Sequence, residues 1–247
     1  MGTNITPKHI ILCEGITDAI LISYFLADVS GWKFEKSKNA PFENFSSNIN
    51  WYRTKQANYC AIWSVGGCDF TKAVEIIIGR EKIEHSIENI VIVTDNDDVG
   101  AVNQRFSDIQ DVIKRELGLS SLSNLSQAGC DITVTDGFQN KNIISLQYLL
   151  VPENKSGALE TFILDALSEQ DEGKKDVIRK VEDFVNNFES DRYLRERREK
   201  TKAKLGVSLA IFSPDKIFTT MDEFLRSTKW GKFETTNTQF QILKDLK

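Results

Sequence analysis

The sequence has few of the residues that most often carry nucleophilic, redox or zinc chemistry. Among its 247 residues there are only two histidines, His9 and His85, so a centre built on several His ligands is nearly excluded. The four cysteines are scattered and form no C-x-x-C pair, which argues against a structural zinc site and against a disulfide framework. Cys13, beside Glu14, is kept as an alternative reactive thiol, but a cysteine buried in the first strand is the favoured interpretation. Any metal bound here must then be a hard cation held by carboxylates.

The chain also lacks a long apolar run. Its apolar stretches, such as residues 10–13 and 90–93, are far shorter than the ~20 residues that cross a bilayer. Residues 1–30 do not read as a signal peptide, because Glu14 and Asp18 interrupt the apolar stretch there. We therefore expect no membrane contact and a cytoplasmic location.

Strong positive charge, the usual mark of nucleic-acid binding, is missing from the chain as a whole. The formal net charge is −5, but residues 191–204 reverse the sign, with seven basic residues against three acidic ones. This stretch is predicted to be a helix that lines a phosphate backbone through Arg195, Arg198 and Lys202. The alternative is a solvated helix face with ion pairs within the helix. Four aromatic residues could stack on bases if they are exposed: Trp32, Trp51, Tyr52 and Trp63.

Short β-rich runs alternate with helical patterns over the first 150 residues. Strands are predicted at 9–13, 59–65, 90–94, 131–135 and 143–151, and helices at 16–27, 69–78 and 102–117. This alternation predicts an α/β fold, a mostly parallel sheet with helices on both faces. We expect this domain to span residues 1–155, with an irregular insertion or weak hairpin at 30–57.

The pattern becomes helical after about residue 157. Helices are predicted at 158–167, 175–187, 191–205 and 221–225, with a terminal helix within 230–247. We therefore expect residues 156–247 to form a helical C-terminal region that packs on the α/β core.

Acidic residues follow two of the predicted strands. Glu14 comes directly after the first strand, and Asp95 and Asp97 come after the third. Ligands of parallel sheets bind beyond the carboxyl ends of the strands, and carboxylates brought together there repel one another unless a cation neutralises them. The pattern predicts a Mg²⁺ or Mn²⁺ site. A single acidic residue at a strand end can instead cap the next helix, and Asp98 suits that role.

Other phosphate and metal motifs fit less well. An EF-hand loop counted from Asp95 would need oxygen ligands where Val99 and Phe106 stand, and no Walker A or G-x-G-x-x-G loop is present. The D-x-D string after an apolar strand also resembles the nucleophile motif of haloacid-dehalogenase phosphatases. That leaves a small-molecule phosphatase or phosphotransferase using Asp95 as an alternative, although a βαβαβ segment precedes the motif here.

Two segments resemble the motifs of Toprim domains. Residues 13–18 (CEGITD) resemble a strand followed by E-G-x-x-D, and residues 91–100 (VIVTDNDDVG) resemble a strand followed by D-x-D and a glycine. The glycine pair at 66–67 and the segment 157–160 (GALE) are similar to features of OLD-family and stand-alone Toprim proteins. The crowding of acids at 95–98 departs from the family pattern.

The resemblance implies a Mg²⁺-dependent nuclease or related phosphodiester-transfer enzyme acting on DNA or RNA. In that reading Asp95 and Asp97 hold the cation, Glu14 ligates it or acts as general acid/base, and Glu160 completes a second metal position.

A catalytic lysine on a following helix is also implied, and the sequence offers Lys202 and Lys204 without choosing between them. Asp18 and Asp98 are either outer ligands or helix caps. The resemblance further suggests phage defence or DNA repair, with a separate ATPase chain or a second copy of this chain as partner. A Toprim-fold module that binds or regulates without cleaving is the second hypothesis.

Overall fold

The computed structural model describes residues 7–35, 49–54, 58–66, 69–96, 98–119, 129–188, 192–216 and 220–246, without the side chain of Glu84. Asp97 of the predicted site lies outside the described residues, as does Gly67 of the glycine pair. The chain forms two compact units. Unit 1 comprises Met1–Thr94, Asp98–Leu150 and Ile242–Lys247, and unit 2 comprises Asp95–Asp97 and Val151–Gln241.

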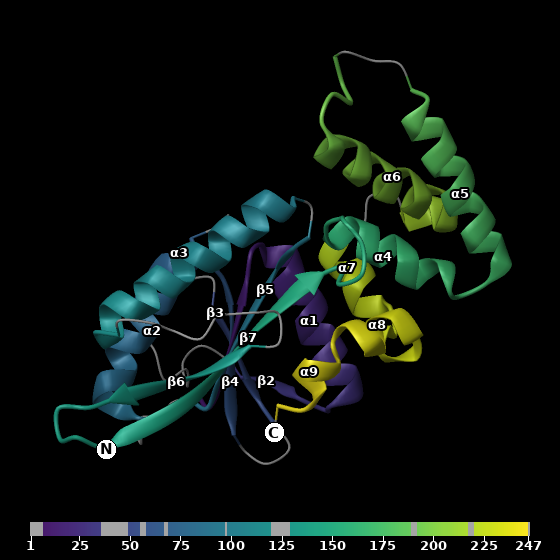
Figure 1. The fold of residues 1–247 in the computed structure, drawn as a ribbon. Coiled ribbons are helices and arrows are strands. Elements are labelled where there is room, and N and C mark those ends of the chain that lie inside the picture. The colour runs from purple at the N-terminus through teal and green to yellow at the C-terminus, as the bar shows by residue number, and fades with distance from the viewer. Residues whose placement is uncertain are drawn as a thin grey trace. The chain divides into compact units, whose positions relative to one another are not determined.

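The described strands form one sheet in the order β2-β3-β4-β1-β5-β7-β6 (Figure 1). Strand β1 pairs in parallel with both β4 and β5, whereas β2–β3, β3–β4 and β6–β7 are antiparallel. The sheet is parallel around its central strand β1 and antiparallel toward both edges, and with its helices it confirms the predicted α/β fold. The strands are β1 His9–Cys13, β2 Lys33–Glu35, β3 Ile49–Arg53, β4 Tyr59–Ser64, β5 Asn89–Asp95, β6 Cys130–Thr135 and β7 Lys141–Val151.

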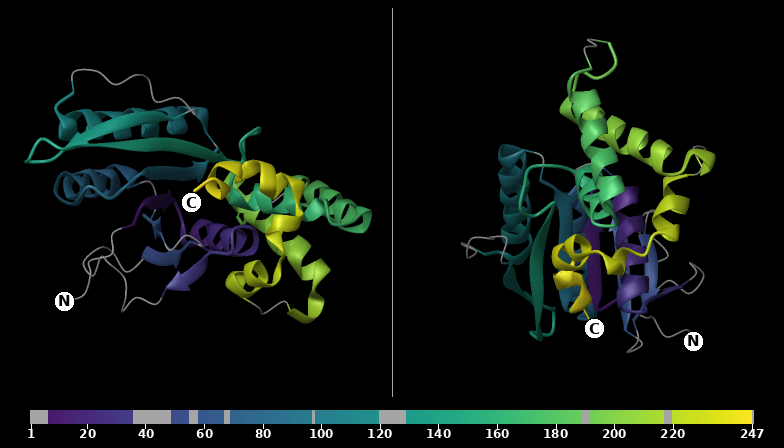
Figure 2. Two further views of the ribbon diagram at one scale, coloured as in Figure 1. Left: turned by 90° about the horizontal axis from the view of Figure 1, so that it is seen from below. Right: turned by 90° about the vertical axis from the view of Figure 1, so that its right-hand side faces the viewer.

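Three long helices cover the two faces of the sheet in unit 1 (Figure 2). Helices α2 (Phe70–Glu84) and α3 (Val99–Leu117) pack on alternate residues of the central strands, such as Ile10 and Leu12, in one buried cluster. Helix α1 (Ile16–Val29) contacts β1 and β4 on the opposite face, where residues such as Ile11 are fully buried. Burial on both faces explains the continuous apolar runs that predicted these strands.

The segment predicted to be an irregular insertion contributes the edge strands β2 and β3. Lys33–Glu35 pairs antiparallel with Trp51–Arg53, which matches the hairpin alternative for the described part of 30–57. Residues 36–48 lie outside the described residues. The side chain of Trp51 is buried in the cluster that also holds α2 and α3, so this segment belongs to the core of unit 1.

Unit 2 is helical. Its helices are α4 Leu159–Ser168, α5 Glu172–Asn186, α6 Arg197–Phe212, α7 Met221–Ser227 and α8 Glu234–Gln239, with short 3₁₀ turns at Pro214–Lys216 and Trp230–Lys232, and α9 Gln241–Lys244 follows. Aromatic contacts join distant parts of this unit. The rings of Phe162 and Phe240 meet edge to face at 5.2 Å, and fully buried Trp230 donates its indole N–H to the carbonyl of Leu225.

Among the described residues, no helix combines the length and apolarity needed to cross a bilayer.

Candidate functional site

Glu14 of unit 1 lies at the junction of two neighbouring strands. It directly follows β1, whose last residue, Cys13, aligns with Val93 of β5. The hydroxyl of Thr94 donates to Glu14 Oε2 at 3.2 Å, and Arg105 of α3 places Nη1 3.6 Å from the same oxygen. Arg105 also donates to the Thr94 hydroxyl. The Glu14 carboxylate therefore sits in a mostly buried polar network that supplies one positive charge.

Two of the candidate carboxylates in unit 1 accept hydrogen bonds at the N-termini of helices. Asp18 Oδ2 accepts the backbone N–H of Gly15 at 2.9 Å, at the start of α1. Asp98 Oδ1 accepts the backbone N–H groups of Gly100 at 2.8 Å and Ala101 at 3.2 Å, as the N-cap of α3. Both side chains thus satisfy backbone donors that a helix cannot pair within itself.

In unit 2, Asp95 is joined to the start of α4. Its Oδ1 accepts the backbone N–H of Leu159, the first residue of that helix, at 3.1 Å. The residue at the N-cap position itself, Ala158, has no side chain that can do this. Glu160 is the next residue of α4, and its negative charge is also favoured at a helix N-terminus. Asp95 and Glu160 are therefore both associated with the N-terminus of α4.

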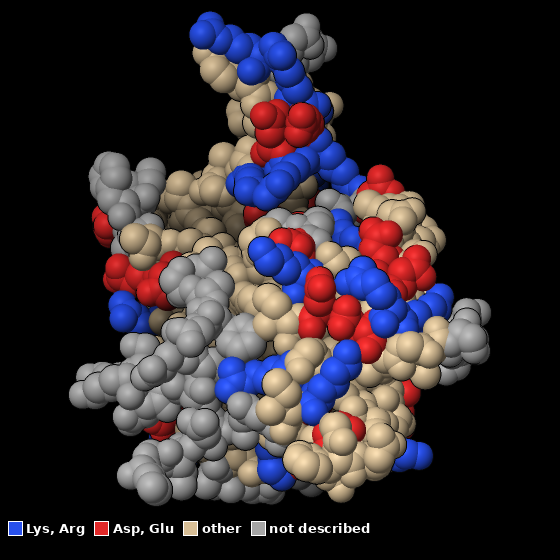
Figure 3. Space-filling model, turned by 90° about the vertical axis from the view of Figure 1, so that its left-hand side faces the viewer, with Lys and Arg blue, Asp and Glu red and all other residues tan. Residues whose placement is uncertain are grey.

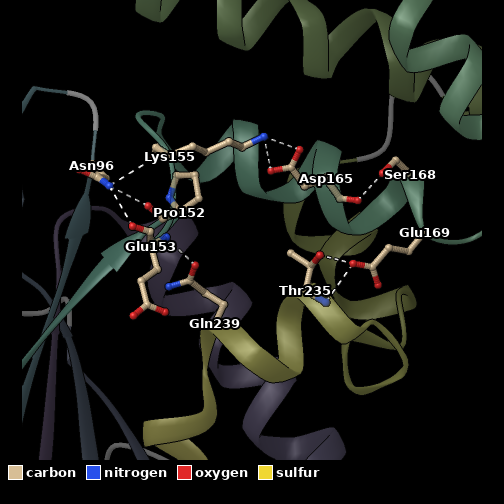
Figure 4. Close-up of polar contacts among 9 residues, drawn as sticks. All are labelled: Asn96, Pro152, Glu153, Lys155, Asp165, Ser168, Glu169, Thr235 and Gln239. Carbon is tan, nitrogen blue, oxygen red and sulfur yellow. Dashed lines mark hydrogen bonds and ion pairs between the residues drawn. The ribbon is translucent and has the colours of Figure 1, made fainter.

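Asn96 fixes the chain that leads into α4 (Figure 4). Its side-chain amide donates to the carbonyls of Pro152 at 3.0 Å, Glu153 at 3.3 Å and Lys155 at 3.2 Å. Its backbone carbonyl accepts the N–H of Gly157 at 2.8 Å. An added Cβ at Gly157 would lie 3.0 Å from the side chain of Thr161, so a larger residue here would require that neighbour to shift. The sequence segment 157–160, singled out for its resemblance, is thus held beside the Asp95–Asn96 segment.

The structure distinguishes the two candidate lysines. Lys202 of α6 places Nζ 3.9 Å from Glu160 Oε1, whereas no contact of the Lys204 side chain with a described carboxylate is found. On the same helix, Arg197 donates to the Ser156 hydroxyl at 2.8 Å. Lys202 is therefore the lysine that accompanies Glu160 in unit 2.

The possible metal ligands in these two networks are the oxygens of Glu14, Thr94, Asp95 and Glu160. Such oxygens suit Mg²⁺ or Mn²⁺ and not a soft metal, so the residue types fit the predicted cation. Among the residues that the structure describes, which exclude Asp97, no three His, Cys, Asp or Glu side chains gather as a ready metal site. The magnesium site stays a prediction.

Cys13 does not have the properties of a reactive thiol. It is fully buried in β1, and burial raises its pKa well above the ordinary value, with the charges of Asp18 and Cys60 adding to the effect. A thiol that stays protonated is a poor nucleophile.

Sequence reasoning missed Arg105, whose partner is Glu14. The spacing of Arg105 on α3 could have indicated that it faces the sheet. Arg105 lies three residues after buried Val102 and four residues before buried Ile109. That spacing places Arg105 on the face of the helix that meets the sheet.

Sequence reasoning also missed a cavity of about 1560 Å³ within unit 2. It is lined by residues of α4, α6, α7 and α8, among them Phe162, Phe212 and Phe224, and by the ion pair Lys155–Asp165 at 2.6 Å (Figure 4). None of the predicted site residues lines it.

Comparison with known proteins gives a family and a distant structural likeness. The crystal structure of hypothetical protein PH0156 from Pyrococcus horikoshii OT3 is similar with a TM-score of 0.41 and 12% sequence identity, over 89% of this chain and 95% of that one. A search of curated proteins gave no match. The model of the family described as "Protein of unknown function (DUF3226)" matches residues 8–243, and the chain belongs to this family.

Proposed function

We propose that this protein is a Mg²⁺- or Mn²⁺-dependent enzyme that cleaves or transfers phosphodiester bonds in DNA or RNA. One observation carries the proposal: the two acidic sequence motifs follow neighbouring parallel strands. Strands β1 and β5 pair directly, with Cys13 opposite Val93. Glu14 accepts a hydrogen bond from Thr94, the residue that precedes Asp95 in the sequence. Adjacent parallel strand ends are where such folds build ligand sites.

The arrangement in unit 2 adds support. Asp95 and Glu160 share the start of α4, and Lys202 adds a positive charge beside Glu160. In the proposed enzyme, Asp95, Asp97 and Glu160 are cation ligands, and Lys202 offsets negative charge that develops on the phosphoryl group. A bound divalent cation would polarise the phosphoryl oxygens.

Glu14 takes one of two roles in this proposal, cation ligand or general acid/base. Arg105 offsets the charge of Glu14, and the hydroxyl of Thr94 holds the carboxylate by donating to Oε2. A carboxylate held in this way can exchange a proton with a water or leaving group at a defined position. The Toprim resemblance of residues 13–18 and 91–100 agrees with these roles. A cytoplasmic role in phage defence or DNA repair, with a separate ATPase chain, belongs to the same proposal.

A cleavage assay tests the function. Labelled single- and double-stranded DNA and RNA are incubated with Mg²⁺, Mn²⁺ or EDTA and with three variants. Asp95→Asn removes the charge but keeps an oxygen for the Leu159 N–H, and Glu14→Gln keeps an acceptor for Thr94. Glu182→Gln on α5 is the matched control, because this carboxylate has no hydrogen bond or ion pair with a described residue.

Metal-dependent cleavage by wild type and Glu182→Gln is expected, with losses of roughly 100-fold or more in Asp95→Asn and Glu14→Gln. Wild type that cleaves none of the substrates, or Asp95→Asn that cleaves as fast as wild type, would contradict the proposal.

A second candidate function, a binding module that does not cleave, also has an observation in its favour. Two of the candidate carboxylates already have structural partners, Glu14 in Arg105 and Asp95 in the N-terminus of α4. A module of this kind, with or without a bound cation, leaves every substrate intact in the same assay.

A further inference from the structure

The aromatic residues that the sequence offered for base stacking are buried. Trp32, Trp51, Tyr52 and Trp63 are at most 8% exposed. Three other rings are open to solvent where α5 ends and the chain approaches α6: Phe184 (59%), Phe188 (41%) and Tyr193 (64%). The exposure of large aromatic rings to water is unfavourable in free energy, and a group of such rings is typical of an interaction surface.

The three rings belong to one region of unit 2. Phe184 and Phe188 are one helical turn apart, with ring centroids 5.7 Å from each other. The guanidinium of Arg192 lies 5.3 Å from the centroid of the Tyr193 ring. Helices α5 and α6 pack against each other, so the residues at this turn share one end of the pair. We call Phe184, Phe188, Tyr193, Arg192, Arg195 and Arg198 the α5–α6 corner.

The corner is strongly basic in an acidic protein. Residues 192–204 contain seven Lys or Arg and two Glu. Figure 3 shows Lys and Arg side chains gathered at the top of the view, around one small acidic cluster. The side chains of Arg198 and Lys200 have no hydrogen-bond or ion-pair partner among the described residues.

The two glutamates of this stretch, Glu196 and Glu199, take part in the start of α6. Glu199 Oε2 accepts the backbone N–H groups of Arg195 at 2.8 Å and Glu196 at 3.0 Å. These bonds belong to the capping box that starts α6, in which the Glu196 side chain also takes part. Glu199 Oε2 thus serves the backbone donors at the start of α6.

We propose that the α5–α6 corner binds single-stranded nucleic acid, with unpaired bases stacked on Phe184, Phe188 and Tyr193 and phosphates held by Arg192, Arg195 and Arg198. Aromatic rings set in a positive surface are how proteins engage single strands, because every unpaired base offers a stacking face and every nucleotide a phosphate. A duplex hides those faces. The inference rests on the proposed function and narrows its substrate to single strands.

Binding is measured with cleavage blocked. Fluorescein-labelled poly-dT, poly-U and a mixed-sequence duplex, each about 20 nucleotides long to exceed a usual site size, are titrated in EDTA and followed by fluorescence anisotropy. The ring variant carries Phe184→Ala, Phe188→Ala and Tyr193→Ala. The control is Phe138→Ala, a ring 89% exposed in the turn between β6 and β7 of unit 1. Because all these rings are exposed, thermal melts are expected to be unchanged.

Wild type and Phe138→Ala are expected to bind single strands more tightly than duplex, and the ring variant is expected to lose roughly tenfold or more. Arg195→Ala with Arg198→Ala should weaken binding and lower the slope of log K against log salt by about 1 to 2. The poly-dT and poly-U arms show whether DNA or RNA is preferred. Wild-type affinity in the ring variant, tighter binding of duplex, or no binding of nucleic acid by wild type would overturn the inference, the last outcome pointing to a protein partner.

The same variants separate this inference from the proposed function. If wild type cleaves and the ring variant binds and cleaves as well as wild type, the corner proposal is wrong and the enzyme proposal stands. If single strands bind through the rings while no substrate is cleaved with metal, the enzyme proposal is wrong and the corner proposal stands.

Discussion

The carboxylate of Asp95 accepts the backbone N–H of Leu159 at 3.1 Å, so a side chain that the sequence predicts as a metal ligand also starts helix α4. This contact ties the end of β5 to the segment containing Glu160, 65 positions further along the chain. It also means that substitutions of Asp95 affect both charge and structure, and that the two effects must be separated by the choice of substitution.

Replacing Asp95 should distinguish its capping role from its charge. Asp95→Ala removes the acceptor for Leu159 and is expected to lower the free energy of unfolding by about 1 kcal/mol. Asp95→Asn keeps an acceptor oxygen and should cost less. Urea denaturation followed by circular dichroism measures both, and equal losses in the two variants would contradict the capping role.

Glu14 and Arg105 should be energetically coupled. Their side chains are mostly buried and 3.6 Å apart at the nearest charged atoms, so removing one leaves the other poorly solvated. We expect Glu14→Gln and Arg105→Gln each to lower the free energy of unfolding by about 1 to 2 kcal/mol, with a coupling energy near 1 kcal/mol in the double mutant. Strictly additive losses would show that the contact contributes nothing.

Asn96→Ala should loosen the segment that leads into α4. The change removes the amide that donates to the carbonyls of Pro152, Glu153 and Lys155 (Figure 4). We expect a loss of about 1 to 2 kcal/mol and faster amide hydrogen exchange over residues 152–160. Unchanged exchange there, with exchange at a distant strand such as β4 as the internal control, would argue against this role.

Much of the central sheet could be predicted because its signal is local. Residues 9–13 and 90–94 are short β-branched or apolar runs followed by acidic or glycine residues, and the strands His9–Cys13 and Asn89–Asp95 match them closely. The positions of Asp95 and Glu14 at strand ends could be predicted for the same reason, because a residue's place at a strand end can be read without knowing what packs beside it.

The errors in helix bounds arise from interactions that no local pattern contains. Helix α2 was expected to stop at residue 78, before Gly79, yet it continues to Glu84. Buried Glu81 accepts hydrogen bonds from Ile87 N–H at 3.1 Å and from the distant Asn142 side chain at 2.6 Å, which favours the longer helix.

Helix α6 was expected at 191–205 and instead spans Arg197–Phe212, so the predicted charge run overlaps only its first part. The capping box of Glu196 and Glu199 sets the start. The burial of Leu205 and Ser208 against neighbouring helices favours its continuation. The contact of Lys202 with Glu160 depends on that tertiary packing, so the sequence left the choice of lysine open.

The cysteines should differ in reactivity according to burial. Burial raises the pKa of the Cys13 and Cys60 thiols well above the ordinary value, so both stay protonated at neutral pH and moderately above it. Cys130 is partly exposed. Burial also raises the pKa of its thiol, but this thiol is accessible to a reagent in the folded protein. With iodoacetamide at pH 8, peptide mass spectrometry should find Cys130 labelled before Cys13 and Cys60, and both buried thiols labelled only in denaturant. Rapid native labelling of Cys13 would restore it as a candidate nucleophile.

Binding of Mn²⁺ by the intact protein tests the central claim most directly, because it needs neither substrate nor turnover. Electron paramagnetic resonance reports free Mn²⁺ during a titration of wild type, Asp95→Asn, Glu14→Gln and the Glu182→Gln control. We predict specific binding to wild type and to Glu182→Gln, competed by Mg²⁺, and a loss of about tenfold or more in affinity for Asp95→Asn. Equal Mn²⁺ affinity in wild type and Asp95→Asn, or no specific binding to wild type, would contradict the assignment of these carboxylates to a divalent cation.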